Sequence, residues 1–249
     1  WEEVQDDKPS LFARVTAMFA KKSQTDDARF SDVHRAVELV ATEQQSMSER
    51  TDQSLSSQDK RLAALETSLQ EQQAAYDALL PGLEDAAPHS ALLYGVTGSG
   101  KTLVFLKLIE HCLQMGRRAL VLVPEISLTP QMTRRLKSMF GSRLAVQHSA
   151  LNNTERLLQW RMIQNGDADI VIGTRSAIFS PLQNIGLIIL DEEQEHTYQS
   201  ESAPRYSAHD VAKKRAMMEH SLLLFSSATP RTETYHAAIS SRMRLVTLK

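Results

Sequence analysis

Residues 91–102 read ALLYGVTGSGKT, where a short apolar run meets a turn with three glycines and then a lysine and a threonine. Residues 101–115 follow with the apolar spacing of a helix. Glycines between a strand and a helix let the backbone curl so that its N–H groups point at phosphate oxygens. The stretch therefore predicts a strand, a phosphate-binding loop and a helix in succession.

The residue types of this loop fit a nucleoside triphosphate and its metal. The first turn of the following helix adds partial positive charge. Lys101 is expected to neutralise the β- and γ-phosphates, and the Thr102 hydroxyl to bind Mg²⁺. We predict that ATP and Mg²⁺ are bound by Gly95, Val96, Thr97, Gly98, Ser99, Gly100, Lys101 and Thr102.

Short apolar runs and helical stretches alternate through the rest of the chain. Strands are predicted at 91–95, 119–124, 143–149, 169–174, 187–193 and 221–230, and helices at 101–115, 127–140, 153–165 and 207–219. Runs so rich in Val, Ile and Leu are typical of strands that are buried on both faces of a sheet. The pattern predicts a doubly wound α/β domain, with a mostly parallel sheet and helices on both faces.

An acidic cluster ends the apolar run at 187–193, which reads LIILDEE. Carboxylates at the carboxyl end of a parallel strand lie at the ligand-binding edge of such sheets. Asp191 is expected to hold Mg²⁺, and Glu192 to polarise the attacking water. Together with the glycine-rich loop, these acids define a P-loop NTPase.

Three further segments lie after predicted strands. Ser227, Ala228 and Thr229 form a helicase signature that couples the nucleotide state to the grip on nucleic acid, although Thr229 could also simply cap a helix. The loops at 123–131 and 172–182 suit contacts with a phosphodiester backbone. Their alternative role is helix capping by Ser127 and Ser176. The expected nucleic-acid contacts in these two loops are Thr129, Thr174 and Arg175.

Composition excludes several classes of protein. The 249 residues carry 28 basic and 30 acidic side chains, a net charge of −2, so a polycation that coats nucleic acid is excluded. No apolar run approaches the roughly 18–20 residues of a membrane span, and the acidic N-terminus does not resemble a signal peptide. A single cysteine, Cys112, excludes a disulfide framework or a cysteine-rich zinc site within this sequence. We expect a cytoplasmic protein.

Residues 1–66 differ from residues 67–249. They are rich in Gln, Ser and charge, they contain no strand-like run, and we expect them to be helical and partly disordered. Apolar residues at heptad-like spacing between Leu55 and Leu79 predict one long helix. That helix could lie on its own domain or pair with a second copy. Residues 67–249 are predicted to form the ATP-binding domain.

The segments GVTGSGKT, LVPEISLTPQ, IVIGTRSAIFSPL, LIILDEE and SATP together resemble the primosomal replication-restart DNA helicases of superfamily 2. The resemblance covers residues 67–249 and implies the first RecA-like motor domain of an ATP-dependent 3′-to-5′ helicase. It implies single-stranded or forked DNA and primosome proteins as partners, with no membrane, and we expect a monomer. It also implies zinc in the full-length family, for which this sequence has no ligand cluster.

The resemblance also implies roles for single residues. Gln73 matches the glutamine that reads adenine, although Gln72 could take that place. Gln194, with Asp191, Glu192 and Lys101, belongs to the catalytic set, and Ser227 and Thr229 couple the two sites. The loop at 197–210 resembles an aromatic-rich loop, in which Tyr198 and Tyr206 are expected to stack on single-stranded DNA.

This sequence departs from the family pattern at several positions. Gln194 replaces a histidine, which puts the strength of coupling in doubt, although glutamine can still hydrogen-bond to Ser227 or Thr229. Gln199 follows Tyr198 where the family has lysine, and Ser226 replaces the glycine before SATP. Lys213, Lys214 and Arg215 form a basic run that marks either a DNA-binding face or a solvated helix.

The sequence reads as an excised or truncated piece, without a second motor domain and its arginine finger. We therefore expect weak Mg-ATP binding, very slow hydrolysis and no unwinding by this chain alone. Two alternatives stay open at this point. One is a non-catalytic DNA- or partner-binding module with ATP as a structural ligand, and the other is a small-molecule kinase.

Overall fold

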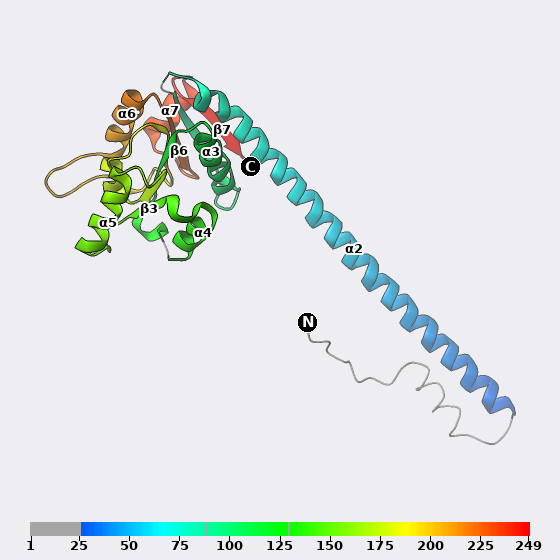
Figure 1. Ribbon diagram of the computed structural model, residues 1–249. Coiled ribbons are helices and arrows are strands. Elements are labelled where there is room, and N and C mark those ends of the chain that lie inside the picture. Colours follow the sequence, from blue (N-terminus) through cyan, green and yellow to red (C-terminus); the bar gives the residue numbers. More distant parts are fainter. Residues whose placement is uncertain (1–25, 88, 129) are drawn as a thin grey trace. The chain divides into compact units, whose positions relative to one another are not determined.

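The computed structural model describes residues 26–249, apart from Pro88, Thr129 and some side chains of the first helix and of residues 130–135. The chain divides into two units, Trp1–Leu65 and Glu66–Lys249. The long helix α2 (Asp26–Glu84) passes through this division and continues through Pro81 (Figure 1). The predicted helical N-terminal segment is confirmed for its described part.

The apolar residues at heptad-like spacing in the middle of α2 are exposed to solvent. Leu62, Leu65 and Leu69 are largely exposed, whereas Leu79 and Leu83 are fully buried. Among the described side chains of α2, those at its end, Leu79 and Leu83, pack into the core of the second unit. Pairing of its exposed stretch with a second copy stays a prediction.

The second unit contains a seven-stranded sheet in which every strand pairing is parallel. Its order is β3-β4-β2-β5-β6-β1-β7. The strands are β1 (His89–Gly95), β2 (Arg118–Leu122), β3 (Leu144–Gln147), β4 (Ile170–Gly173), β5 (Ile185–Leu190), β6 (Leu222–Ser227) and β7 (Arg244–Leu248). The predicted parallel α/β fold is confirmed.

Helices cover both faces of this sheet. The α-helices are α3 (Lys101–Gln114), α4 (Pro130–Phe140), α5 (Asn153–Gln164), α6 (Ala208–Glu219) and α7 (Thr232–Ile239). Four short 3₁₀ helices follow strands or helices: η1 (Glu125–Ser127), η2 (Gly141–Arg143), η3 (Arg175–Phe179) and η4 (His196–Tyr198). The end of α2 packs with α3 and α4 in one core, and α5, α6 and α7 pack in the other.

Alternation along each strand separates the two cores. In β1, Leu93 contributes to the core under α3, whereas Leu92 contributes to the core under α6. Successive side chains of a strand point to opposite faces, so a strand with helices on both sides must be apolar throughout. This explains why the runs at 119–122 and 187–190 lack the polar alternation of a half-exposed strand.

Two elements near the C-terminus were not predicted. Helix α7 and strand β7 follow SATP, and β7 pairs with β1 at the edge of the sheet. The exposed polar side chains of Arg244 and Thr247 weaken the apolar signal of β7. The strand order was not predicted from the sequence either. This order places the loops after β5, β6 and β1 side by side.

Candidate functional site

The glycine-rich loop lies between β1 and α3. Gly98 and Gly100 have φ angles of 86° and 89°, which is the left-handed region that glycine adopts without strain. Gly100 is the N-cap of α3, and no side chain caps that helix end. The N–H groups at the start of α3 therefore remain available for an anion. Thr102, in the first turn of α3, is exposed beside them.

Lys101 turns back onto the loop. Its Nζ donates to the carbonyl of Gly95 at 2.6 Å and to that of Val96 at 3.2 Å, and the side chain is buried. The ammonium group thus lies inside the loop, where a phosphate chain would meet it. Ser99 Oγ is buried in the same loop and has no hydrogen-bond partner among the described residues.

Gln72, rather than Gln73, contacts this loop. Gln72 is buried, and a Cβ atom on Gly100 would lie only 2.1 Å from its Nε2. Gln73 is exposed and bonds instead to Asp77 and Lys107. The geometry therefore favours Gln72, the alternative that the sequence analysis kept, as the glutamine nearest a bound nucleotide.

Asp191 follows β5 and faces the loop across the end of β6. Its Oδ1 accepts hydrogen bonds from the Ser226 hydroxyl at 2.9 Å and the Glu192 N–H at 3.0 Å. Burial raises the pKa of Asp191, whereas the Ser226 hydrogen bond and the charge of Lys101 act in the opposite direction. The strand order also places Asp191 and the glycine-rich loop at the same edge of the sheet, one strand apart.

Glu192 has a φ of 46°, a left-handed conformation that is uncommon for a residue with a side chain. Such backbone strain concentrates at functional sites, where the surrounding structure maintains it. The turn at Glu192 separates its side chain from that of Asp191, so that the two carboxylates do not share one set of partners.

Replacing Asp191 with asparagine is expected to stabilise the fold at pH 7, on the order of 1 kcal/mol. An acid whose pKa is raised by burial binds its proton more tightly when folded, so ionisation reduces stability. The loss of stability caused by ionised Asp191 is absent below pH 3.8, the ordinary pKa of this carboxyl. It grows as the pH rises and is complete above the raised pKa. Urea unfolding of both proteins between pH 3.5 and 8 measures the difference. An equal gain at every pH would contradict the electrostatic cause.

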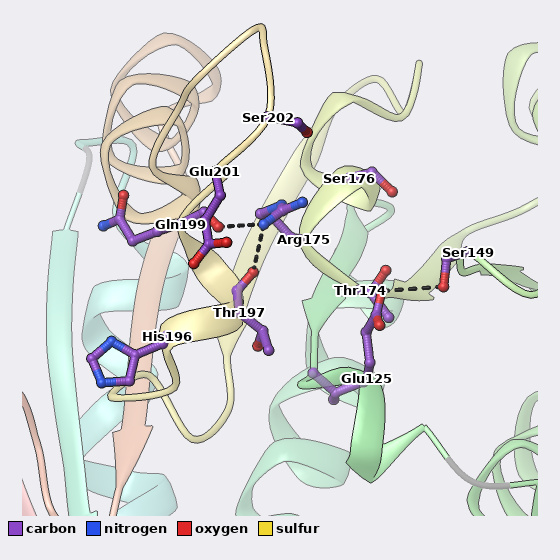
Figure 2. A pocket seen from close by; sticks show the side chains of 11 residues that line it. Glu125, Ser149, Thr174, Arg175, Ser176, His196, Thr197, Gln199, Glu201 and Ser202 are labelled. Carbon is purple, nitrogen blue, oxygen red and sulfur yellow. Dashed lines mark hydrogen bonds between the residues drawn. The ribbon is translucent and has the colours of Figure 1, made fainter.

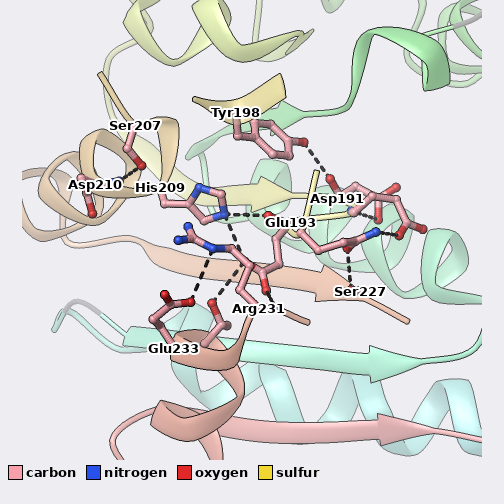
Figure 3. Close-up of polar contacts among 12 residues, drawn as sticks. Asp191, Glu193, Tyr198, Ser207, His209, Asp210, Ser227, Arg231 and Glu233 are labelled. Carbon is pink, nitrogen blue, oxygen red and sulfur yellow. Dashed lines mark hydrogen bonds and ion pairs between the residues drawn. The ribbon is translucent and has the colours of Figure 1, made fainter. Parts of the chain in front are cut away.

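A chain of hydrogen bonds joins the acidic turn to the end of β6 (Figure 3). Gln194 Nε2 donates to Glu192 Oε2 at 2.9 Å, and the Ser227 hydroxyl donates to Gln194 Oε1 at 2.6 Å. Ser227 Oγ also accepts the Thr229 N–H at 2.8 Å. The glutamine therefore makes the contact with Ser227 that the sequence analysis considered.

Glu193 was missed by the sequence analysis. Its side chain is fully buried and accepts hydrogen bonds from the Arg231 N–H at 2.7 Å and the Thr234 hydroxyl at 3.1 Å. His209 Nε2 lies 3.0 Å from the carboxylate and 2.8 Å from the Glu193 carbonyl, so this nitrogen carries the hydrogen (Figure 3). Only the unusual third acid after the strand could have signalled this role.

The prediction that Tyr198 stacks on DNA is wrong. Its ring is fully buried, and its hydroxyl donates to the carbonyl of Asp191 at 2.7 Å (Figure 3). Burial and the nearby carboxylates raise the pKa of Tyr198 well above 10. A ring without an exposed face cannot stack on a base, so Tyr198 instead holds the start of the aromatic-rich loop against the acidic turn.

A polar cavity of about 560 Å³ opens beyond the ends of β2 and β4. Figure 2 shows Arg175 reaching across it to the loop after β5, where its guanidinium donates to the carbonyls of Thr197, at 3.1 Å, and Gln199. The same guanidinium lies over the Tyr206 ring, 5.6 Å from its centroid. The contacts of the Arg175 guanidinium are thus with the aromatic-rich loop, which it stabilises.

Tyr206 has an aromatic neighbour, Phe179, near the protein surface. Phe179, which is half exposed, meets it edge to face with ring centroids 4.9 Å apart. Nearby, Gly173 lets β4 and η3 lie close to the end of β3, because a Cβ atom there would lie 2.3 Å from the Gln147 carbonyl and 2.5 Å from Ala177 Cβ. Phe179 was not predicted as a contact, although its place four residues after Arg175 puts it at the same edge of the sheet.

The remaining predicted contacts differ in their surroundings. Thr174 is buried beside the cavity, and Thr129 lies outside the described residues. Arg215 donates to the carbonyls of Ile178 and Leu182, both at 2.6 Å, so it fixes the loop after β4. Arg215 is therefore neither a free DNA contact nor simply solvated, whereas Lys213 and Lys214 are exposed, and for them both alternatives stay open.

The RecA-like sheet and this arrangement of loops define a P-loop helicase motor domain. The model of the DEAD/DEAH box helicase family matches residues 69–237, and the chain belongs to that family. It is 47% identical over 179 residues to the replication restart protein PriA of Bacillus subtilis, covering 72% of this chain and 22% of that protein. The PriA of Synechocystis is 41% identical over 232 residues, with 90% and 28% covered.

These relatives confirm the predicted resemblance to the first motor domain of replication-restart helicases. The chain spans only about a quarter of their length. Among solved structures, RecG bound to a three-way DNA junction is 25% identical with a TM-score of 0.55, covering 72% of this chain and 24% of RecG. The helicase MrfA bound to DNA and AMPPNP, at 18% identity and a TM-score of 0.51, covers 72% of this chain and 26% of MrfA, and it shares the fold.

No helix in the described part of the chain is long and apolar enough to cross a membrane. Within residues 26–249, as far as they are described, no three His, Cys, Asp or Glu side chains form a group that could hold a metal ion by themselves.

Proposed function

We propose that this chain is the ATP-binding half of an ATP-dependent 3′-to-5′ DNA helicase of replication restart. The observation that carries the proposal is the sheet order, in which β6 lies between β5 and β1. The acids after β5, the Ser227 turn and the glycine-rich loop are thereby neighbours. A change at the phosphate site can pass directly to the segments that lead to the nucleic-acid side.

The chain's own residues fit ATP and Mg²⁺. Lys101 would leave the carbonyls of Gly95 and Val96 and bind the phosphates, while Gln72 would contact the base. Thr102 and Asp191 would hold Mg²⁺, which neutralises phosphate charge when bound. Asp191 suits this role because its Oδ2 has no hydrogen-bond partner among the described residues.

Glu192 would orient the attacking water. Its Oε2 is held by Gln194, which is in turn held by Ser227. A shift of Ser227 or Thr229 therefore moves the glutamate through two hydrogen bonds. This path supports the predicted coupling between hydrolysis and the grip on DNA.

The cavity beyond β2 and β4 is the proposed path of single-stranded DNA. Thr174 and Ser176 line it, and their hydroxyl groups could donate to phosphate oxygens, whereas the Ser149 hydroxyl already donates to Glu125 at 3.1 Å. Arg175 orders the loop at one wall, and Tyr206 with Phe179 provides aromatic rings beside it. We propose forked DNA and primosome proteins as partners, a monomeric state and a cytoplasmic location.

We expect this chain alone to hydrolyse ATP more slowly than about 1 per second. In motors of this type an arginine from a second domain stabilises the transition state, and its contribution is about 10³–10⁵ in rate. The described residues form a single RecA-like sheet. A coupled ATPase assay with and without single-stranded DNA measures the rate.

Faster turnover would show that the chain completes its active site alone or with a second copy. The alternative is a non-catalytic module in which ATP is a structural ligand. In that case the chain binds ATP, but ATP does not change its affinity for DNA and DNA does not change its affinity for ATP. Asp191→Asn is the matched control in the assay, because it should abolish hydrolysis without unfolding the protein.

A further inference from the structure

We propose that Ser226 is a positioning residue, which sets the orientation of the Asp191 carboxylate for Mg²⁺. The inference rests on the proposed function, in which Asp191 binds the metal of Mg-ATP. It concerns the last residue but one of β6, immediately before the turn that begins at Ser227. Nothing in the resemblance assigns a role to a side chain at this place.

Strand register brings the two side chains together. Leu190 of β5 pairs with Phe225 of β6, so the next residues, Asp191 and Ser226, also lie side by side. The Ser226 hydroxyl is fully buried and donates to Asp191 Oδ1 at 2.9 Å. Because β6 is held between β5 and β1, this hydroxyl has little freedom to move.

The hydrogen bonds leave one carboxylate oxygen for the metal. Oδ1 already accepts from Ser226 and from the Glu192 N–H, whereas Oδ2 has no partner among the described residues. With both donors on Oδ1, the carboxylate cannot rotate without losing a charge-assisted hydrogen bond. Mg²⁺ requires near-ideal octahedral geometry, so a preset oxygen lowers the cost of binding.

The hydroxyl is not simply a small polar group that fits the core. Ser221, just before the same strand, is equally buried, and its Oγ has no hydrogen-bond partner among the described residues. It therefore offers a matched control: Ser226→Ala and Ser221→Ala each remove one buried hydroxyl, but only the first removes a bond to Asp191.

The test measures how much Mg²⁺ strengthens nucleotide binding. A fluorescent ATP analogue is titrated into the chain in excess Mg²⁺ and in EDTA, and the ratio of the two dissociation constants is compared. Ser226→Ala is expected to reduce this ratio about fivefold to tenfold while leaving the constant in EDTA unchanged. Ser221→Ala should leave both constants unchanged.

Two more variants guard against a folding defect. Ser226→Gly should lose the same share of the Mg²⁺ effect as Ser226→Ala, and Ser226→Thr, which keeps the hydroxyl, should restore it. Thermal unfolding of each variant is recorded beside the titrations. A loss that is equal in Mg²⁺ and in EDTA would reflect a general structural role and would overturn the inference.

Failure of the inference can be told from failure of the proposed function. If Asp191→Asn abolishes the Mg²⁺ effect but Ser226→Ala and Ser226→Gly preserve it, Asp191 is a metal ligand and the positioning role of Ser226 is overturned. If Asp191→Asn itself preserves the effect, the metal is bound elsewhere, and both the proposed role of Asp191 and the inference are overturned.

Discussion

Replacing Lys101 with alanine is expected to weaken Mg-ATP binding by about 100-fold. The ammonium group lies inside the glycine-rich loop, bonded to two of its carbonyls, and is positioned to move onto the phosphates. Hydrogen bonds to charged groups contribute about 1.5–3 kcal/mol, and each 1.4 kcal/mol changes the affinity tenfold. Titration with a fluorescent ATP analogue measures the loss.

Lys107→Ala is the matched control for this experiment. Lys107 lies on the same helix, α3, and its Nζ donates only to the exposed Gln73 at 2.7 Å. It should bind nucleotide with nearly unchanged affinity. An equal loss for both variants would mean that long-range charge attracts the nucleotide, and a Lys101→Ala variant with full affinity would remove the phosphate site from this loop.

Replacing Glu193 with glutamine is expected to reduce the free energy of unfolding by about 3–5 kcal/mol. The buried carboxylate accepts from Arg231, Thr234 and His209, and an amide would turn its own N–H groups toward at least one of these donors. Breaking a buried, hydrogen-bonded pair typically costs this much. For a domain of this size the melting temperature should fall by roughly 6–20 °C.

Glu195→Gln provides the comparison, because it lies two residues farther along and its side chain is only partly buried. Its melting temperature should stay within about 1–2 °C of the starting protein. Circular dichroism during heating and urea titration both report the change. A loss below about 1 kcal/mol for Glu193→Gln would mean that Arg231, Thr234 and His209 find other acceptors.

The stability of this cluster also bears on coupling. Glu193 joins the acidic turn to α6 through His209 and to α7 through Thr234. His209 stacks on Phe225 of β6, and its ring also meets the edge of Tyr198. The acidic turn is therefore joined to α6, α7 and the aromatic-rich loop by contacts of Glu193 and His209.

The glycine-rich loop and the acidic turn were predicted from local sequence. The loop at 95–102 and the acids after the strand at 187–190 depend on backbone freedom and residue type within a few positions. The apolar runs likewise identified six of the seven strands, because a strand covered on both faces must be apolar along its whole length. These properties belong to short segments and depend little on residues far away in the chain.

The partners of each side chain were decided by tertiary structure. The order of the strands placed Ser226 beside Asp191, α6 brought His209 to Glu193, and the loop after β5 buried Tyr198 while leaving Phe179 exposed. A tyrosine or glutamate has the same local signal whether it lies on the surface or in the core. Its surroundings come from residues far away in the chain, which crossovers between strands bring together.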